Sequence, residues 1–113
     1  MTIKIQNITN ETIQRHTIST DAKDVILRLY FLPTVESWFM DVSYGSKTVK
    51  GVRLIVGAYH IASANFPCDF IVEDALKFGV DPFHADDFSS DRCRLYMLEA
   101  ADMVALRGQP VPL

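Results

Sequence analysis

The sequence has few cysteines, no long apolar run and no signal for secretion. Its two cysteines, Cys68 and Cys93, are too few and too far apart for a disulfide framework or a zinc ribbon, so we expect reduced, partly buried thiols. No apolar stretch approaches the roughly 20 residues that cross a bilayer. The opening residues, MTIKIQNITNET, lack the basic end and apolar run of a signal peptide. The sequence therefore predicts a protein without a membrane segment that is synthesised and folds in a cytoplasm.

An excess of basic residues is also missing. The formal net charge is −3 and the pI is near 5.5, and no basic patch is visible, which argues against a nucleic-acid partner. The chain has 113 residues, of which 49% are hydrophobic and 22% charged, an ordinary globular mixture. We therefore expect a single β domain over residues 1–108, followed by an extended proline-rich tail over residues 109–113.

Residues 37–56 carry the clearest structural pattern, that of a β-hairpin. Trp38, Met40, Val42 and Tyr44 alternate with more polar positions, as in a strand with one buried face. Gly45 begins a two-residue turn, and a change in the apolar phase at residues 50–51 predicts a β-bulge at Gly51.

Other segments extend this pattern to an all-β fold. Alternating residues predict strands at residues 2–8, 12–19, 25–32, 70–72 and 92–98, and residues 25–32 are apolar on both faces, as in a central strand or a subunit contact. Residues 99–107 have helical spacing before Gly108. We predict a small barrel or sandwich of six or seven mainly antiparallel strands with a short C-terminal helix.

Half of the fourteen carboxylates lie in one stretch that contains the long connection of residues 73–91. They are Asp69, Glu73, Asp74, Asp81, Asp86, Asp87 and Asp91. Oxygen-rich loops suit calcium, but the spacing of an EF-hand is absent. The favoured interpretation is a solvated loop with local Asx turns and caps. Loops of this length often cover the mouth of a barrel or contact a partner. A calcium-binding or small-ligand β module stays the alternative.

No catalytic constellation is visible. His16, His60 and His84 do not lie at ligand spacing with each other or with the cysteines, so no metal site is predicted. No nucleophile elbow or glycine-rich phosphate loop frames a serine or cysteine. The sequence predicts a protein that is not an enzyme and needs no cofactor.

Three segments carry a family resemblance. The segment WFMDVSYGSKTVKGVRLIVG resembles the hairpin of the baseplate plug proteins of contractile-tailed phages. FPCDFIVED resembles a later segment of that family, with Cys68 where the family has glycine. DPFHADDFSSDRCRLYML resembles its ending, through Asp81-Pro82, Arg92, Leu95 and Leu98. The likeness spans residues 30–98, and residues 99–113 have no counterpart.

The resemblance implies a structural subunit of the virion, in the tail baseplate, assembled in the host cytoplasm. It would join or seal the region where tube, hub and spike meet, in several copies around the tail axis. Its expected partners are tail tube proteins and hub or spike proteins, with tape-measure proteins as a further candidate. Such a protein works by packing and strand pairing. The contact residues that we expect are Ile3, Ile5, Leu27, Tyr30, Phe83, Phe88, Val111 and Leu113. The residues that we expect to shape turns or bulges are Gly45, Gly51, Pro67 and Pro82.

Overall fold

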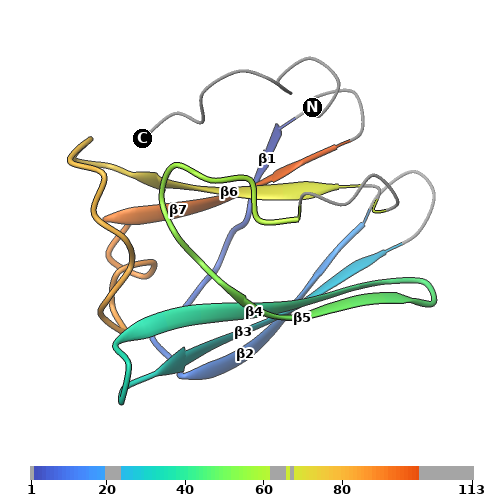
Figure 1. The fold of residues 1–113 in the computed structure, drawn as a ribbon, viewed down its shortest axis with the longest axis horizontal. Helices are drawn as coiled ribbons and strands as arrows, with labels where there is room; N and C mark the ends of the chain where they lie inside the picture. The colour runs from blue at the N-terminus through green and yellow to red at the C-terminus, as the bar shows by residue number, and fades with distance from the viewer. Residues whose placement is uncertain (1, 20–23, 62–65, 67, 100–113) are drawn as a thin grey trace.

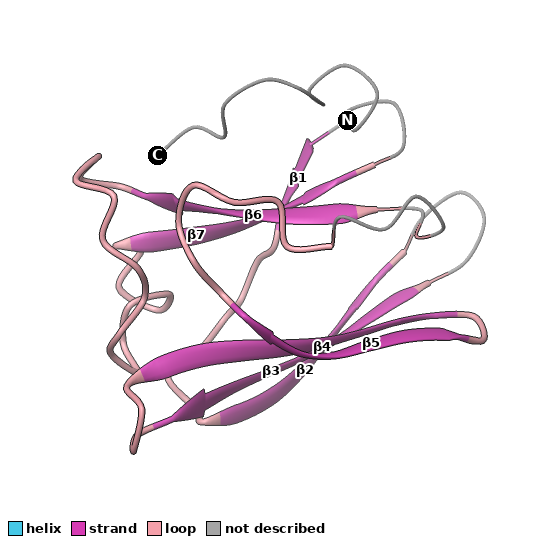
Figure 2. Cartoon of the chain, in the orientation of Figure 1, coloured by secondary structure: helices cyan, strands magenta, loops and turns pink. Residues whose placement is uncertain are grey.

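The computed structural model describes residues 2–19, 24–61, 66 and 68–99. In this part of the chain all regular structure is β-strand, as Figure 2 shows. The strands are β1 (Thr2–Lys4), β2 (Ile13–Ile18), β3 (Val25–Leu32), β4 (Ser37–Tyr44), β5 (Lys47–Arg53), β6 (Asp69–Asp74) and β7 (Cys93–Leu98). The predicted helix at residues 99–107 lies outside the described residues except for Glu99, and the tail at 109–113 lies wholly outside them.

The strands form two separate sheets that face each other. One has the order β1-β7-β6 and the other the order β2-β3-β4-β5, and neighbouring strands in both are antiparallel. Figure 1 shows the two layers one above the other, open at their sides. Of the two predicted all-β architectures, the structure is therefore the sandwich, and no closed barrel forms among the described residues.

The core lies between the two layers and follows from the alternation in the sequence. In β3, Val25, Leu27 and Leu29 face inward with at most 1% of their surface exposed, and the residues between them face outward. Trp38 at the start of β4 is fully buried, and its ring meets that of Phe88 edge to face at 5.4 Å. Strand β3 is central in its sheet, as its two apolar faces predict.

The hairpin of β4 and β5 turns at residues 45–46 and contains one irregularity. Gly45 has a φ of 59°, which suits the first position of a tight hairpin turn. The register shifts because one residue, Asp41, stands opposite two, Lys50 and Gly51. Gly51 has a φ of 70°, and its N–H donates to the Asp41 carboxylate at 2.8 Å. The change of apolar phase in the sequence thus corresponds to a bulge in β5.

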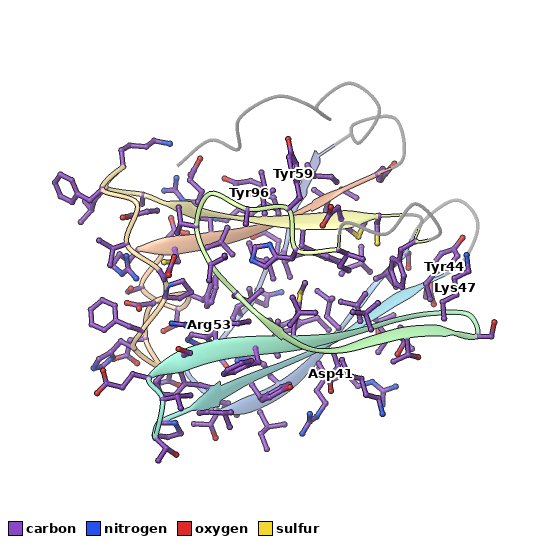
Figure 3. All side chains as sticks on the ribbon, viewed as in Figure 1. Asp41, Tyr44, Lys47, Arg53, Tyr59 and Tyr96 are labelled. Carbon is purple, nitrogen blue, oxygen red and sulfur yellow. The ribbon has the colours of Figure 1, made fainter. Side chains whose placement is uncertain are left out.

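The three-stranded sheet joins the first and the last strand of the described residues. The N-terminal strand β1 pairs with β7, and the Ile5 N–H continues the pairing by donating to the Leu95 carbonyl at 2.8 Å. On the outer side of this sheet, Ile71 and Leu98 are buried with Tyr59 and Tyr96 packed against them. Figure 3 shows the two tyrosines on that side, away from the four-stranded sheet.

Candidate interaction surface

The loop of residues 75–91 is held by two buried carboxylates. Asp74, at the end of β6, is 1% exposed and accepts the N–H groups of Leu76 at 2.9 Å and Val80 at 3.0 Å. Burial acts to raise the pKa of Asp74, but these backbone hydrogen bonds and the charge of Arg92 outweigh it, and the pKa is lowered. Asp74 is therefore ionised at neutral pH and fixes the first part of the loop.

Asp87 fixes the second part of the loop together with Arg92. The Asp87 carboxylate accepts the N–H groups of Phe83 at 2.7 Å and His84 at 2.8 Å. Arg92 donates to both oxygens of Asp87, at 2.8 and 2.9 Å, and to the carbonyl oxygens of Val80 and Asp81. Burial raises the pKa of Asp87, yet the bonds from Arg92 and the backbone lower it further than burial raises it.

The loop is also tied to both sheets. The Asp81 carboxylate accepts the Val56 N–H at 2.8 Å, and the Trp38 indole donates to the His84 carbonyl at 3.0 Å. Phe88 is 6% exposed and belongs to the core. The expectation of a solvated acidic loop is therefore wrong in part, because Asp74 and Asp87 lie inside as acceptors for the loop's own backbone. The loop closes one end of the sandwich, as its orange trace in Figure 1 shows.

Exposed apolar side chains gather at this end of the molecule. Among the described residues, the large hydrophobic side chains classed as exposed have between 41% and 77% of their surface open to solvent: Ile13, Leu32, Val35, Leu76, Phe78, Val80 and Phe83. Four come from the loop, and the other three come from the start of β2, the end of β3 and the turn between β3 and β4. We call these seven residues the apolar end.

The apolar end is built by the topology. Ile13 pairs with Tyr30 near the end of β3, and Leu32 and Val35 follow directly at the turn. Trp38 follows that turn, and its indole N–H donates a hydrogen bond to the His84 carbonyl. This bond holds the loop beside the turn. Figure 1 shows the turn, the start of β2 and the loop at the same side of the sandwich, opposite the β4-β5 turn. Residues far apart in the sequence therefore lie at the same end of the sandwich.

The predicted contact residues do not share one environment. Phe83 is 48% exposed at the apolar end, and Tyr30 is half-buried on the outer face of the four-stranded sheet, where its ring stacks on Phe39 at 5.7 Å. Ile3 is half-buried on the edge strand β1. Val111 and Leu113 lie outside the described residues.

Three of the predicted contact residues are corrected by their position. Leu27 has no exposed surface, Ile5 is 5% exposed and Phe88 is 6% exposed, and all three belong to the core. Their side chains point between the sheets because the alternation of the strands and the fold of the loop turn them inward. None of the three offers a surface to a partner in this structure.

The predicted turn residues are placed as follows. Gly45 and Gly51 occupy left-handed backbone at the hairpin turn and the bulge. Pro82 is buried in the loop between the two carboxylate anchors. Pro67 lies outside the described residues.

The His60 ring and the two cysteine thiols are titratable groups whose surroundings in the fold shift their pKa values. The His60 ring accepts the Ile55 N–H at Nε2, 2.9 Å away, and donates from Nδ1 to the Phe70 carbonyl at 2.7 Å. Burial lowers the pKa of His60, so this ring is neutral at pH 7. Burial also raises the pKa of the Cys68 and Cys93 thiols to about 12. These groups are hydrogen-bonded or packed and do not converge on a reacting centre.

Within the described ranges, no three His, Cys, Asp or Glu side chains come together in a group that could hold a metal ion. The described part of the chain also contains no helix long and apolar enough to span a membrane.

Sequence reasoning missed most of the apolar end. It selected Phe83 but not Leu76, Phe78 or Val80, although these three alternate with Lys77 and Gly79 directly after an acidic anchor. The available signal was the alternation of these apolar residues with Lys77 and Gly79 inside an acidic connection. Ile13, Leu32 and Val35 carried no such signal, because only the pairing of β2 with β3 brings them to the loop.

The fold defines a small all-β sandwich protein with exposed apolar side chains at one end. Among protein families, the model "Cyanophage baseplate Pam3 plug gp18" matches residues 2–100. The chain belongs to this baseplate plug family and is a structural component of a phage baseplate. The family match confirms the resemblance found in the sequence and extends it to the N-terminal strands. No curated protein matches the sequence.

Proposed function

We propose that this subunit packs its apolar end against neighbouring baseplate proteins, joining or sealing the region where tail tube, hub and spike meet. The observation that carries the proposal is the concentration of exposed hydrophobic side chains at one end of the sandwich. Patches of this kind on a soluble domain mark interaction sites. The work is done by packing, with no chemical step and no cofactor.

The build of the loop favours tight contact. Full burial of a side chain such as Phe78 contributes on the order of 1.5–3 kcal/mol, and four such side chains project from residues 75–91. Asp74, Asp87 and Arg92 already fix the backbone that carries them. Binding therefore orders little additional chain, which removes a cost that flexible loops have.

The proposal assigns the protein to the virion, at the tail baseplate, after synthesis in the host cytoplasm. Its partners are tail tube proteins and hub or spike proteins, with tape-measure proteins as a further candidate, and several copies lie around the tail axis. The alternative of a free-standing calcium-binding or small-ligand module has less support. The carboxylate oxygens of Asp74, Asp81 and Asp87 already accept hydrogen bonds from backbone N–H groups and from Arg92.

Co-expression with the neighbouring baseplate proteins tests the proposal. The double variant Phe78→Asp/Phe83→Asp places charges on two exposed side chains that contribute little to the core. We expect recovery of the complex to fall at least about tenfold, because each buried anchor contributes more than 1 kcal/mol. The measurement is co-purification followed by quantitative mass spectrometry of the complex.

The control places the same charge at the other end of the sandwich. Ser46→Asp lies in the exposed turn between β4 and β5, and should bind partners as the wild type does. Circular dichroism and melting temperature establish that both variants fold. Equal partner recovery by the wild type and the Phe78→Asp/Phe83→Asp variant would contradict the proposal.

A further inference from the structure

The outer face of the four-stranded sheet is basic, although the chain as a whole is acidic. We call its four cations, Arg15, Arg28, Lys50 and Arg53, the basic face. The register places Arg15 beside Arg28 and Arg28 beside Asp41, and sets Arg53 opposite Phe39. Asp41, the carboxylate among them, pairs with Arg28 at 3.2 Å. This face has a formal charge of +3 while the whole chain has −3, so all other residues together carry −6.

The basic face has a shape and an apolar component that suit a protein partner. A shallow depression of about 380 Å³ is lined by Arg15, Arg28 and Lys50 together with the apolar side chain of Ile26. Beside it, Ile13, Tyr30 and Phe39 form one row across β2, β3 and β4. The Arg28 guanidinium lies over the Tyr30 ring at 4.7 Å. Figure 3 shows Asp41 on this outer side of the sheet.

A surface of the opposite character lies on the same chain. Residues 73–92 contain six carboxylates and two basic side chains, but Asp74 and Asp87 are buried beside Arg92 and do not belong to the surface. The carboxylates nearer the surface are Glu73 and Asp91, which are in ion pairs with basic side chains, and Asp81 and Asp86. The Asp86 side chain is 58% exposed, and its carboxylate lies 3.8 Å from Nδ1 of the His84 ring. Leu76, Phe78, Val80 and Phe83 precede it in the same loop and are exposed. This surface therefore combines negative charge with apolar side chains, as the sheet face combines positive charge with apolar side chains.

We propose that the basic face is the docking site for the acidic, apolar loop of a second copy of this chain. The proposal rests on the proposed function, which it deepens by naming one of the partners of the apolar end. Both the charge and the apolar content of the two surfaces are complementary. Because the two surfaces differ, the contact is heterologous, and each copy keeps one free loop and one free face for a further copy.

A second copy fits the observations better than a nucleic acid does. The four cations on this face would attract a nucleic acid, but the chain's net charge of −3 would repel it. A phosphate backbone would also make no favourable contact with the apolar side chains of Ile13 and Ile26. The loop of a second copy supplies carboxylates for the cations and aromatic and aliphatic side chains for the row of Ile13, Tyr30 and Phe39.

Paired variants of the complete chain test this contact. Arg15→Ser/Lys50→Ser removes two cations from the basic face and leaves the loop intact, whereas Asp86→Lys alters the loop and leaves the face intact. Sedimentation velocity of each protein alone should show association weakened about tenfold relative to the wild type. Mixed in equal amounts, the two variants should form a one-to-one dimer that grows no further, because each contributes one intact surface.

A control with the same net charge excludes a general electrostatic effect. Gln6→Glu/Ser46→Glu lowers the formal charge by two, as the face variant does, at exposed positions outside both surfaces. This control should associate as the wild type does. Raised salt should weaken wild-type association, because exposed charge pairs are screened.

Several results would overturn the inference. One is a wild-type chain that stays monomeric at its highest soluble concentration while it still binds baseplate proteins, in which case the proposed function survives alone. Another is a mixture of the two variants that forms no dimer. A third is binding of duplex DNA or of another baseplate protein to the basic face that Arg15→Ser/Lys50→Ser abolishes. Self-association through these surfaces without any binding of baseplate proteins would instead contradict only the proposed function.

Discussion

At the scale of single residues, Arg92 connects most of the structure at the apolar end. It donates to Asp87, lies 3.6 Å from Asp74, and reaches the carbonyl oxygens of Val80 and Asp81. Its side chain is 19% exposed, so these contacts are largely shielded from water. The hydrogen bonds that Arg92 donates to Asp87 are the main reason that the pKa of Arg92 is raised. One guanidinium thus contacts two carboxylates and two adjacent backbone carbonyl groups.

Replacing Arg92 should destabilise the fold strongly. Arg92→Met keeps much of the apolar stem but leaves the buried Asp74 and Asp87 without their cation. We expect a loss of about 2–4 kcal/mol in the free energy of unfolding, because an uncompensated buried charge costs several kcal/mol. Urea unfolding followed by tryptophan fluorescence measures it, since Trp38 lies beside the loop.

A matched exposed pair supplies the control for Arg92. Lys77 meets Glu73 at 3.2 Å, but its side chain is 62% exposed. Lys77→Met should therefore cost less than about 1 kcal/mol. Adding Asp87→Asn to Arg92→Met should cost less than the two changes made separately, because both act on one network. Similar losses for Lys77→Met and Arg92→Met would contradict this account of the loop.

The sequence indicated part of this site at the residue scale. Asx turns and caps were the favoured interpretation of the acidic stretch, and Asp74 and Asp87 do accept backbone N–H groups. That the two carboxylates are buried, and share Arg92, could not be read from the sequence. Both depend on the loop folding back over Trp38, which is 46 residues away from its hydrogen-bond partner His84.

At the scale of elements, the β4-β5 hairpin was the most predictable part of the fold. Its alternation, its Gly-Ser turn and its change of phase are all local signals, and the structure has a strand, a turn and a register shift at these places. Residues 57–61 had no clear period. They run beside β6, where His60 bonds to Phe70 and Val56 pairs with Val72. That edge is a tertiary contact, so the local sequence gave no indication of it.

The bulge gives a prediction about backbone strain. Gly51 has a φ of 70°, and a Cβ built there meets no atom within 4 Å. Gly51→Ala should therefore destabilise the protein by about 1–2 kcal/mol through its backbone conformation alone. Gly51→Asn should cost less, because asparagine tolerates this conformation better. Thermal unfolding of both variants measures the difference.

Ser46→Ala is the control for the bulge, at an exposed neighbouring turn position without a positive φ. It should change the free energy of unfolding by less than about 0.5 kcal/mol. An alanine at position 51 that is as stable as wild type would show that the bulge relaxes without strain. Equal losses of stability in Gly51→Ala and Gly51→Asn would indicate that the cost does not come from the left-handed backbone conformation.

At the scale of the whole molecule, the class of fold was predictable and the pairing of distant strands was not. Period-two patterns indicated antiparallel strands throughout, and the family match agrees with the resemblance in the hairpin and in the later segments. The pairing of β1 with β7 joins residues more than 90 positions apart, such as Thr2 and Leu98. The apolar end arises from that same assembly of distant parts, which is why seven exposed side chains could not be grouped from the sequence.

The rates at which the two cysteine thiols are labelled show whether the sandwich unfolds as one cooperative unit. The register of β6 and β7 places Cys68 at one end of the three-stranded sheet and Cys93 at the other, next to the loop. Burial raises the pKa of both thiols to about 12, so a reagent that needs thiolate should react extremely slowly with the native protein at pH 8. The variants Cys68→Ala and Cys93→Ala leave one thiol each, and we expect both thiols to react at one rate set by global unfolding. Much faster labelling of Cys93 would mean that the loop opens by itself, and the proposed contacts would then rest on a flexible surface that binding must first order.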